Sequence, residues 1–170
     1  KTGTKAIQGK IVLIPATGRA FLRCDTGQGH VTLGPSNPGI GLQNMKIFIT
    51  GGAGFIGSHL TERLTREGHR VTVLDDLSTG RRENLGALDG SNRLQFVEGS
   101  ILDEGLVQSL VADADMIFHL AAAVGVKLIM DEPSRSILTN VRGTENVLNA
   151  ALPRKVSTFI ASTSEVYGKA

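Results

Sequence analysis

Short runs rich in β-branched and aromatic residues alternate with amphipathic stretches from Met45 onward. This alternation is typical of a parallel sheet built from βαβ units. The runs expected to form strands are 46–50, 70–74, 94–98, 116–119 and 157–161.

Helical patterns fill most of the intervals between these runs. Gly68 is the expected stop of the first helix, Asp103 the expected N-cap of a later one, and Pro133 sits at a first-turn position of the longest. The expected helices are 56–67, a weaker one at 83–88, 104–112 and 133–151.

Right-handed crossovers between these strands predict a Rossmann-type, doubly wound α/β fold with strand order 3-2-1-4-5, truncated after strand five. In such a sheet a ligand binds at the carboxyl ends of strands one and four, where the helices leave in opposite directions. A sheet that stops at strand five is also expected to leave an open edge prone to self-association.

The first 44 residues follow a different pattern. Gly, Pro and Asn are scattered through 34–41, and no sustained period of a helix or strand is present. Met45 directly precedes the first strand and has the character of a natural start. We therefore expect residues 1–44 to be an irregular extension and residues 45–170 to be a single, incomplete nucleotide-binding domain.

Charge and cysteine content limit the classes of function. The net charge of +2 conceals a leading segment of +4, with five cations against Asp25, so residues 45–170 carry −2 and are not expected to bind nucleic acid. Cys24 is the only cysteine, which excludes an intrachain disulfide and a cysteine-based zinc site and favours a reducing, cytoplasmic setting. No metal site is predicted, and no apolar run approaches the length of a membrane span.

The strongest chemical signal is the glycine-rich segment between the first strand and the first helix. It reads Gly-x-Gly-x-x-Gly from Gly52 or Gly-x-x-Gly-x-x-Gly from Gly51. One glycine makes the tight turn, a second lets a diphosphate approach the backbone amides, and Gly57 lets the helix pack against the strand. Gly51, Gly54, Phe55 and Ile56 are expected cofactor contacts here, where the helix N-terminus carries a partial positive charge. Glycines that serve packing alone are the alternative, and the strand-to-helix position argues against it.

An acidic pair follows the second strand. Asp75 lies 18 residues after Gly57, close to the spacing of the carboxylate that binds an adenosine ribose. Asp76, next to it, is also expected to contact the cofactor. A carboxylate there repels a 2′-phosphate, so NAD is favoured over NADP. Arg81 and Arg82 leave an NADP-dependent reductase open as an alternative.

Four motifs in order resemble the extended short-chain dehydrogenase/reductase superfamily, in particular the N-terminal portion of its NAD-dependent nucleotide-sugar epimerases, dehydratases and decarboxylases. The matching segments are 50–57 (Thr-Gly-Gly-Ala-Gly-Phe-Ile-Gly), 119–122 (His-Leu-Ala-Ala), 140–144 (Asn-Val-Arg-Gly-Thr) and 162–168 (Ser-Thr-Ser-Glu-Val-Tyr-Gly).

This resemblance implies further cofactor contacts on either side of the glycine turn. After the fourth strand they are Leu120, Ala121 and Ala122, and Asn140 is expected to hold the chain around the nicotinamide half. Ser100 and Ile101 match the adenine contacts, although Ser100 departs from the Asp that is frequent in the family. His119 is more often a packing residue than a catalytic one at this position.

The resemblance also implies catalytic roles near the end of the chain. Thr163 matches the hydroxyl that hydrogen-bonds the reacting sugar oxygen, and Glu165 matches an acid beside the sugar ring, with a solvent-facing strand end as its alternative. Dehydratases typically have Asp where this sequence has Ser164, while decarboxylases also resemble the segment.

The family's general base, a Tyr in a Tyr-x-x-x-Lys pair, has no counterpart, because Tyr167 is followed only by Gly168, Lys169 and Ala170. The resemblance thus implies a nucleotide-sugar epimerase/dehydratase that works through a transient ketone and forms a homodimer when full length, with this chain inactive alone. A nucleotide-sugar decarboxylase, and a non-catalytic dinucleotide-binding module or truncated product, are the alternatives.

Overall fold

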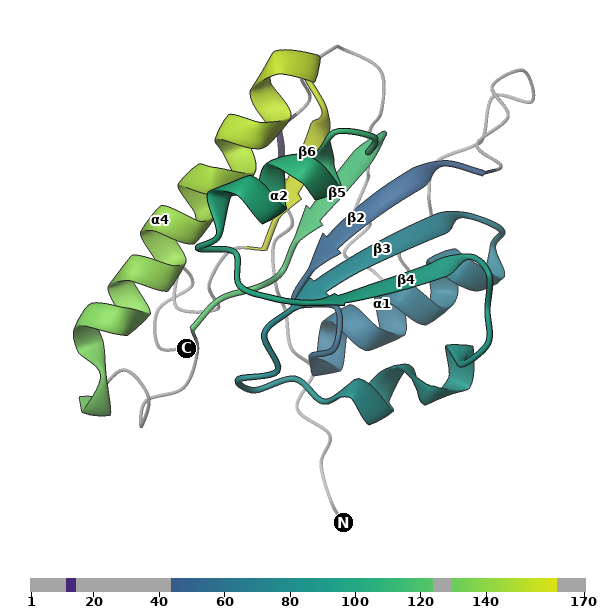
Figure 1. The fold of residues 1–170 in the computed structure, drawn as a ribbon, viewed down its shortest axis with the longest axis horizontal. Helices are drawn as coiled ribbons and strands as arrows, with labels where there is room; N and C mark the ends of the chain where they lie inside the picture. The colour runs from purple at the N-terminus through teal and green to yellow at the C-terminus, as the bar shows by residue number, and fades with distance from the viewer. Residues whose placement is uncertain (1–11, 15–43, 124–129, 162–170) are drawn as a thin grey trace, which may run out of the picture.

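The computed structural model describes residues 12–14, 44–123 and 130–161. Within these residues, six strands form one sheet in the order β1-β6-β5-β2-β3-β4 (Figure 1). The strands are β1 (Val12–Ile14), β2 (Lys46–Thr50), β3 (Arg70–Asp75), β4 (Leu94–Glu98), β5 (Met116–His119) and β6 (Ser157–Ile160). The helices are α1 (Phe55–Arg66), η1 (Arg82–Leu88), α2 (Glu104–Val111), α4 (Pro133–Ala151) and η2 (Leu152–Arg154), of which η1 and η2 are 3₁₀ helices.

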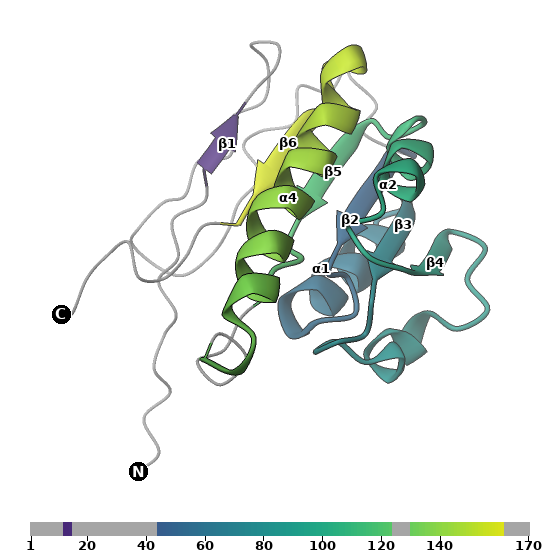
Figure 2. The same ribbon diagram turned by 60° about the vertical axis from the view of Figure 1, so that its left-hand side comes forward.

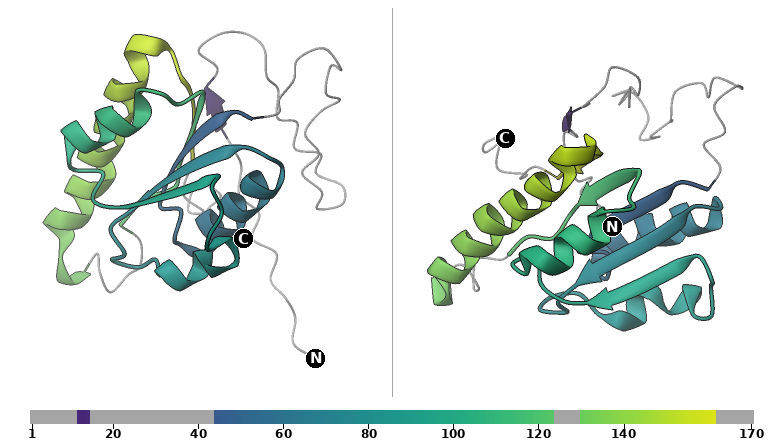
Figure 3. Two further views of the ribbon diagram at one scale, coloured as in Figure 1. Left: turned by 45° about the vertical axis from the view of Figure 1, so that its right-hand side comes forward. Right: turned by 45° about the horizontal axis from the view of Figure 1, so that its top comes forward.

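The five strands from β2 to β6 run parallel to their neighbours in the order 3-2-1-4-5, which confirms the predicted Rossmann-type topology. Figure 3 shows α2 and α4 over one face of this sheet, with α1 and η1 over the other. The helices therefore leave the sheet in opposite directions after β2 and β5, and the carboxyl ends of these two strands form the topological switch point.

The edge of the sheet differs from the prediction. Val12 to Ile14, in the leading segment, form a strand that pairs antiparallel with β6, with Leu13 opposite Phe159 (Figure 2). The sheet thus does not end at the fifth parallel strand, and the expectation of an open edge there was wrong over these three positions. A three-residue strand is too short to produce a periodic sequence signal, which explains why the pattern did not reveal it.

Alternation along β2 divides the core into two clusters. Phe48 packs with α2 and α4 on one face, through residues such as Val107 and Val147. Ile47 and Ile49 face the other side and pack with α1 and η1. Each of these fully buried side chains contributes roughly 1.5–3 kcal/mol through the hydrophobic effect. Together the two clusters fix β2, and with it the turn that follows, from both faces.

The helix ends follow the signals in the sequence. Asp103 caps α2 by accepting a hydrogen bond from the Leu106 amide at 3.0 Å, and Pro133 occupies the first turn of α4. Gly68 follows α1 with a φ of +95°, a left-handed conformation that glycine adopts without steric cost. In the described part of the chain, no helix combines the length and apolar character needed to cross a membrane.

Candidate functional site

The carboxyl ends of three neighbouring strands bring the predicted site together. Thr50 ends β2 at the centre, with Leu74 of β3 opposite it on one side and His119 of β5 opposite it on the other. Asp75 is the last residue of β3. The predicted contacts of the two halves of a dinucleotide thus lie on opposite sides of the turn that follows Thr50.

The glycine turn is fixed by close backbone approaches. Gly51 has a φ of +72°, and its amide donates to the carbonyl of Leu74 at 2.9 Å. A Cβ at Gly51 would lie 2.7 Å from the amide nitrogen of Ala121, and a Cβ at Gly57 would collide with the carbonyl oxygen of Gly51. Both positions therefore require glycine, Gly51 because the segment after β5 lies against it and Gly57 because the carbonyl of Gly51 does.

Three amides at the start of α1 have no hydrogen-bond acceptor in the described part of the chain. The Gly54 amide donates to the Gly51 carbonyl at 3.2 Å, and the Ser58 amide donates to the Gly54 carbonyl at 2.9 Å. The amides between them, of Phe55, Ile56 and Gly57, have no acceptor among the described residues. Unpaired amides at a helix N-terminus carry a partial positive charge, so this turn suits a diphosphate.

Asp75 points into the glycine turn rather than away from it. Its Oδ2 accepts from the Ala53 amide at 2.9 Å, and its Oδ1 accepts from the Leu77 amide at 2.9 Å. The side chain is buried, and Gly80 lies against both carboxylate oxygens. A carboxylate offers about four acceptor positions, so two remain for the hydroxyls of a ribose.

Sequence reasoning missed Asn84, which holds the same turn from η1. Its Nδ2 donates to the carbonyl of Ala53 at 2.8 Å, and the amide of Arg81 donates to that carbonyl at 3.1 Å. The carboxylate of Asp75 and the amide of Asn84 therefore hold both polar atoms of one peptide residue. Asn84 and Ala53 are 31 positions apart, and nothing in the local pattern indicates such a contact.

Two other polar residues of this region, Asp76 and Arg82, are engaged with neighbours of their own. Asp76 is exposed and its Oδ1 accepts from the Ser78 amide at 3.0 Å. Arg82, a candidate for binding a 2′-phosphate, pairs with Asp89 at 3.3 Å and stacks 4.9 Å from the ring centre of Phe96. Arg82 is thus engaged away from Asp75.

The two predicted adenine contacts, Ser100 and Ile101, have different surroundings. Ile101 is only 4% exposed and packs in the core against Gly143, so its side chain is not presented at the crevice. The hydroxyl of Ser100 accepts from the Leu102 amide at 3.2 Å. Asn146, which sequence reasoning also missed, reaches from α4 to donate to the Ile101 carbonyl at 3.0 Å and thereby fixes this loop.

On the opposite side, the segment after β5 is tied to both β2 and α4. The Leu120 amide donates to the Thr50 carbonyl at 3.1 Å, and the Ala121 amide donates to the Thr50 hydroxyl at 3.2 Å. Asn140 accepts from the Ala123 amide at 2.7 Å and donates to its carbonyl at 3.1 Å. Ala122, between these anchors, is exposed.

His119 lies beneath this segment and is buried, with 3% of its surface exposed. Its Nδ1 lies 2.7 Å from the hydroxyl of Thr50, and its Nε2 lies 2.9 Å from the hydroxyl of Thr144. Burial lowers the pKa of His119 to about 4, because the imidazolium would lose its hydration. The ring is therefore neutral at physiological pH.

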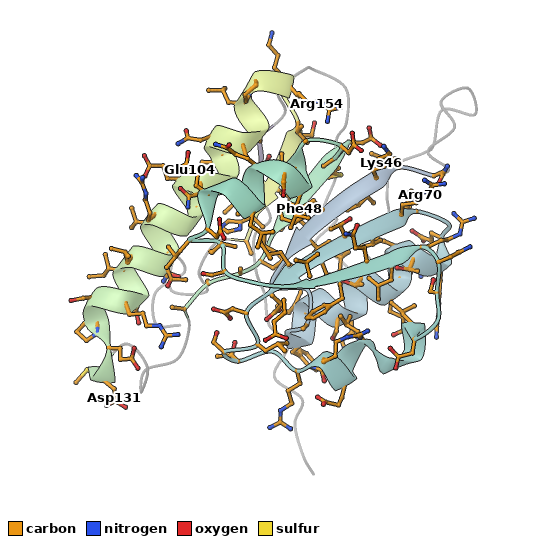
Figure 4. All side chains as sticks on the ribbon, in the orientation of Figure 1. Lys46, Phe48, Arg70, Glu104, Asp131 and Arg154 are labelled. Carbon is orange, nitrogen blue, oxygen red and sulfur yellow. The ribbon has the colours of Figure 1, made fainter. Side chains whose placement is uncertain are left out.

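Two predicted residues cannot be placed: Thr163 and Glu165 lie outside the described residues. A polar depression of about 410 Å³ lies elsewhere, at the amino ends of β2 and β3, where Lys46 and Arg70 stand side by side (Figure 4). It is at the opposite end of the sheet from the glycine turn. No group of three or more metal-ligating side chains gathers within residues 44–123 and 130–161.

Known proteins are similar to this chain in sequence and in fold. The family described as "NAD dependent epimerase/dehydratase family" matches residues 47–170. The UDP-N-acetyl-alpha-D-glucosaminuronate decarboxylase of Bacillus cytotoxicus is 47% identical over 124 residues, which cover 73% of this chain and 38% of that protein. The UDP-glucose 4-epimerase of Mycolicibacterium smegmatis is 42% identical, over 73% of this chain and 41% of that protein.

Solved structures of related enzymes show the same similarity. The dTDP-glucose 4,6-dehydratase DesIV of Streptomyces venezuelae, solved with NAD and TYD bound, is 39% identical with a TM-score of 0.62, over 66% of this chain and 37% of that one. The chain thus spans about two fifths of the length of these relatives.

Proposed function

Because the chain belongs to the NAD-dependent epimerase/dehydratase family, we propose that it binds NAD across the carboxyl ends of β2, β3 and β5. The observation that carries this proposal is the turn between β2 and α1. There the amides of Phe55, Ile56 and Gly57 have no acceptor among the described residues, and the carboxylate of Asp75 bonds the Ala53 amide of the same turn.

The described residues divide the binding of this cofactor among themselves. The amides at the start of α1, with Gly51 and Gly54 beside them, hold the diphosphate, and Asp75 accepts from the adenosine ribose. Asp76, Ser100 and the backbone at Ile101 border the adenine.

The segment after β5 contacts the other half of the cofactor. Leu120, Ala121 and Ala122 form this wall, and Asn140 keeps it in place through Ala123. These assignments rest on the positions of the residues around the crevice.

In the whole protein, we propose that this domain serves an epimerase/dehydratase that acts on a nucleotide sugar through a transient ketone. NAD, when bound, supplies a hydride acceptor that is regenerated within the turnover. Thr163 would hydrogen-bond the reacting sugar oxygen and Glu165 would lie beside the sugar ring. The segment after β5 would hold the nicotinamide half in place beside the reacting sugar carbon.

Decarboxylation of a nucleotide sugar is the second candidate reaction. The 47% identity to a decarboxylase supports it, and so does Ser164 in place of the Asp typical of dehydratases. Product analysis with a UDP-hexose, a dTDP-hexose and a UDP-uronic acid distinguishes the reactions. Release of CO₂ from the uronic acid alone would favour the decarboxylase.

For the 170 residues as they stand, the proposal predicts binding without turnover, because the sequence contains no Tyr-x-x-x-Lys. A tyrosine next to a lysine would supply the phenolate that removes the sugar hydroxyl proton. Conversion of any nucleotide sugar by these 170 residues would contradict this part of the proposal. A non-catalytic binding module would behave in the same way, and the presence of the Tyr-Lys pair in the whole protein separates the two.

We further propose that the whole protein is a homodimer that uses the outer face of α4. Ile137, Val141 and Leu148 are exposed and recur at intervals of 4 and 7 residues, which form one apolar stripe on α4, and the exposed Leu152 follows in η2. Val141→Glu is expected to shift the sedimentation of the whole protein toward monomer. The cytoplasmic setting stays a prediction from the single cysteine.

Calorimetric titration with NADH and NADPH tests the cofactor assignment. Tighter binding of NADH is expected, because the carboxylate of Asp75 repels a 2′-phosphate and Arg82 is paired with Asp89. Tighter binding of NADPH would overturn the role given to Asp75. Binding of neither would contradict the proposed function as a whole.

A further inference from the structure

His119 is the most buried titratable group around the crevice, and the cofactor contacts proposed above do not use it. It sits at the end of β5 between a hydroxyl of β2 and a hydroxyl of α4. Both contacts are short, and both partners can either donate or accept. The direction of each hydrogen bond therefore depends on what the two hydroxyls do elsewhere.

The neighbouring bonds settle these directions. The hydroxyl of Thr144 donates its proton to the Asn140 carbonyl at 2.7 Å, so it can only accept from His119. Nε2 of His119 must then carry the proton of the neutral ring, and Nδ1 must accept the hydroxyl proton of Thr50. The oxygen of Thr50 in turn accepts from the Ala121 amide. One consistent chain of hydrogen bonds runs from Ala121 through His119 to Asn140.

Both ends of this chain meet the same stretch of backbone. Ala121 is held through Thr50, and Ala123 is held through the side chain of Asn140, whose carbonyl receives the Thr144 proton. β2 lies between β3, which carries Asp75, and β5. The stretch from Ala121 to Ala123 is therefore on the side of the crevice away from the adenosine ribose.

We propose that His119 is a positioning residue, fixed as the neutral Nε2–H tautomer between Thr50 and Thr144, which holds Ala121 to Ala123 as the wall for the nicotinamide half of the cofactor. This inference rests on the proposed function. His119 itself touches no ligand.

The geometry explains why an imidazole is needed here. An asparagine overlays the Nδ1 side and reaches Thr50 but not Thr144, whereas a glutamine reaches toward Thr144 and abandons Thr50. A protonated ring would donate at both nitrogens, which leaves the Thr50 proton without its acceptor. Only the neutral ring, hydrogen-bonded at both nitrogens, joins β2 to α4.

The test compares the affinities of NAD and ADP in the whole chain. ADP needs the glycine turn and Asp75 but not the wall after β5, so it reports the adenosine half alone. Thr144→Val removes the acceptor of Nε2–H from α4, an element that contributes no residue to the glycine turn, and Thr144→Ser keeps it. Thr61→Val is the matched control, because Thr61 is a buried threonine whose hydroxyl has no partner among the described residues.

Thr144→Val is expected to weaken NAD binding about tenfold and to leave ADP binding within about twofold. Thr144→Ser and Thr61→Val should bind both ligands like the wild type. Equal loss of both ligands, or loss of neither, would overturn the inference. A wild type that binds neither ligand would contradict the proposed function, and the inference would fall with it.

Nitrogen NMR of the imidazole provides a readout that does not depend on a variant that folds. The wild type should show His119 protonated at Nε2 and unprotonated at Nδ1 at pH 7. A proton on Nδ1, or a doubly protonated ring at that pH, would overturn the inference even where ligand binding is normal.

Discussion

The β3 side and the β5 side of the site are held by different kinds of group, one charged and one neutral. On the β3 side, two side chains hold the glycine turn through Ala53. The carboxylate of Asp75 accepts from the Ala53 amide, and the carboxamide of Asn84 donates to the Ala53 carbonyl. On the β5 side, a buried neutral imidazole joins two hydroxyls beneath the wall. The first side uses a charged group that keeps two acceptor positions unused by the amides, whereas the second uses a group that burial keeps uncharged.

This difference separates binding from positioning. Asp75 retains acceptor positions after it has bound two amides, so it can hold the turn and a ribose together. Both nitrogens of His119 are already engaged, so it has no capacity left for a ligand. The two sides should therefore respond differently to substitution and to pH.

Gly57→Ala should have the largest effect on stability and NAD binding, because it disrupts the glycine turn that both sides share. Its Cβ would collide with the carbonyl oxygen of Gly51, which must shift together with the start of α1. We expect a loss of about 3 kcal/mol or more in the free energy of unfolding, and no measurable NAD binding. Denaturant unfolding and calorimetry measure both.

Gly105→Ala is the control for this substitution. Gly105 lies in α2, and the nearest atom to its added Cβ, an oxygen of Asp103, would be at an ordinary 3.7 Å. It should raise stability by roughly 0.5–1 kcal/mol. A Gly57→Ala variant as stable as this control would contradict the described turn.

A decrease in pH should destabilise the β5 side selectively. The pKa of His119 is lowered to about 4 in the folded chain, while the unfolded chain protonates at about 6.5, so the unfolded state binds the proton first. The stabilisation is complete above pH 6.5 and is lost as the pH falls toward 4. The loss reaches about 3 kcal/mol.

His119→Gln isolates this contribution, since the carboxylates of the chain titrate in both proteins. The difference between the pH profiles of wild type and variant should have its slope between pH 6.5 and 4. Parallel profiles over this interval would show that His119 is not buried in its neutral form.

Asp75→Ala should cost about 2 kcal/mol of stability, because it leaves the amides of Ala53 and Leu77 without an acceptor. It should also remove the preference for NADH over NADPH. Asp113→Ala is the matched control, since Asp113 is exposed and pairs with Lys46 at the opposite end of the sheet. Equal effects of the two substitutions on cofactor preference would remove Asp75 from the proposed site.

Asn84→Ala should have the smallest effect of the series, about 1 kcal/mol in stability, because the Arg81 amide still donates to the Ala53 carbonyl. The accompanying loss of NAD affinity should extend equally to ADP, in contrast to substitutions at Thr144. Loss of NAD affinity with normal ADP affinity would contradict the assignment of Asn84 to the β3 side, which binds the adenosine half.

The sequence predicted most of the fold because its elements carry local signals. The strand from Lys46 to Thr50 and the helix from Pro133 to Ala151 begin and end as expected, since turn residues, caps and apolar periodicity coincide there. The strand from Val12 to Ile14 could not be predicted, because its existence depends on pairing with a partner nearly 150 positions away.

The candidate site shows the same limit. The positions of Gly51, Gly57 and Asp75 follow from a motif between a strand and a helix. The ties made by Asn84, Asn146 and the pair of Thr50 with His119 join residues 31 to 69 positions apart. Long-range hydrogen bonds of this kind leave no periodic trace, and the exposure of Ile101 could not be judged without knowing that Gly143 packs against it.

Backbone amide NMR during titration with NAD tests the central claim most directly. The amides of Phe55, Ile56 and Gly57 are predicted to show the largest chemical-shift changes, because they would acquire the diphosphate as their acceptor. Changes concentrated instead around Lys46 and Arg70, at the opposite end of the sheet, would contradict the proposed site.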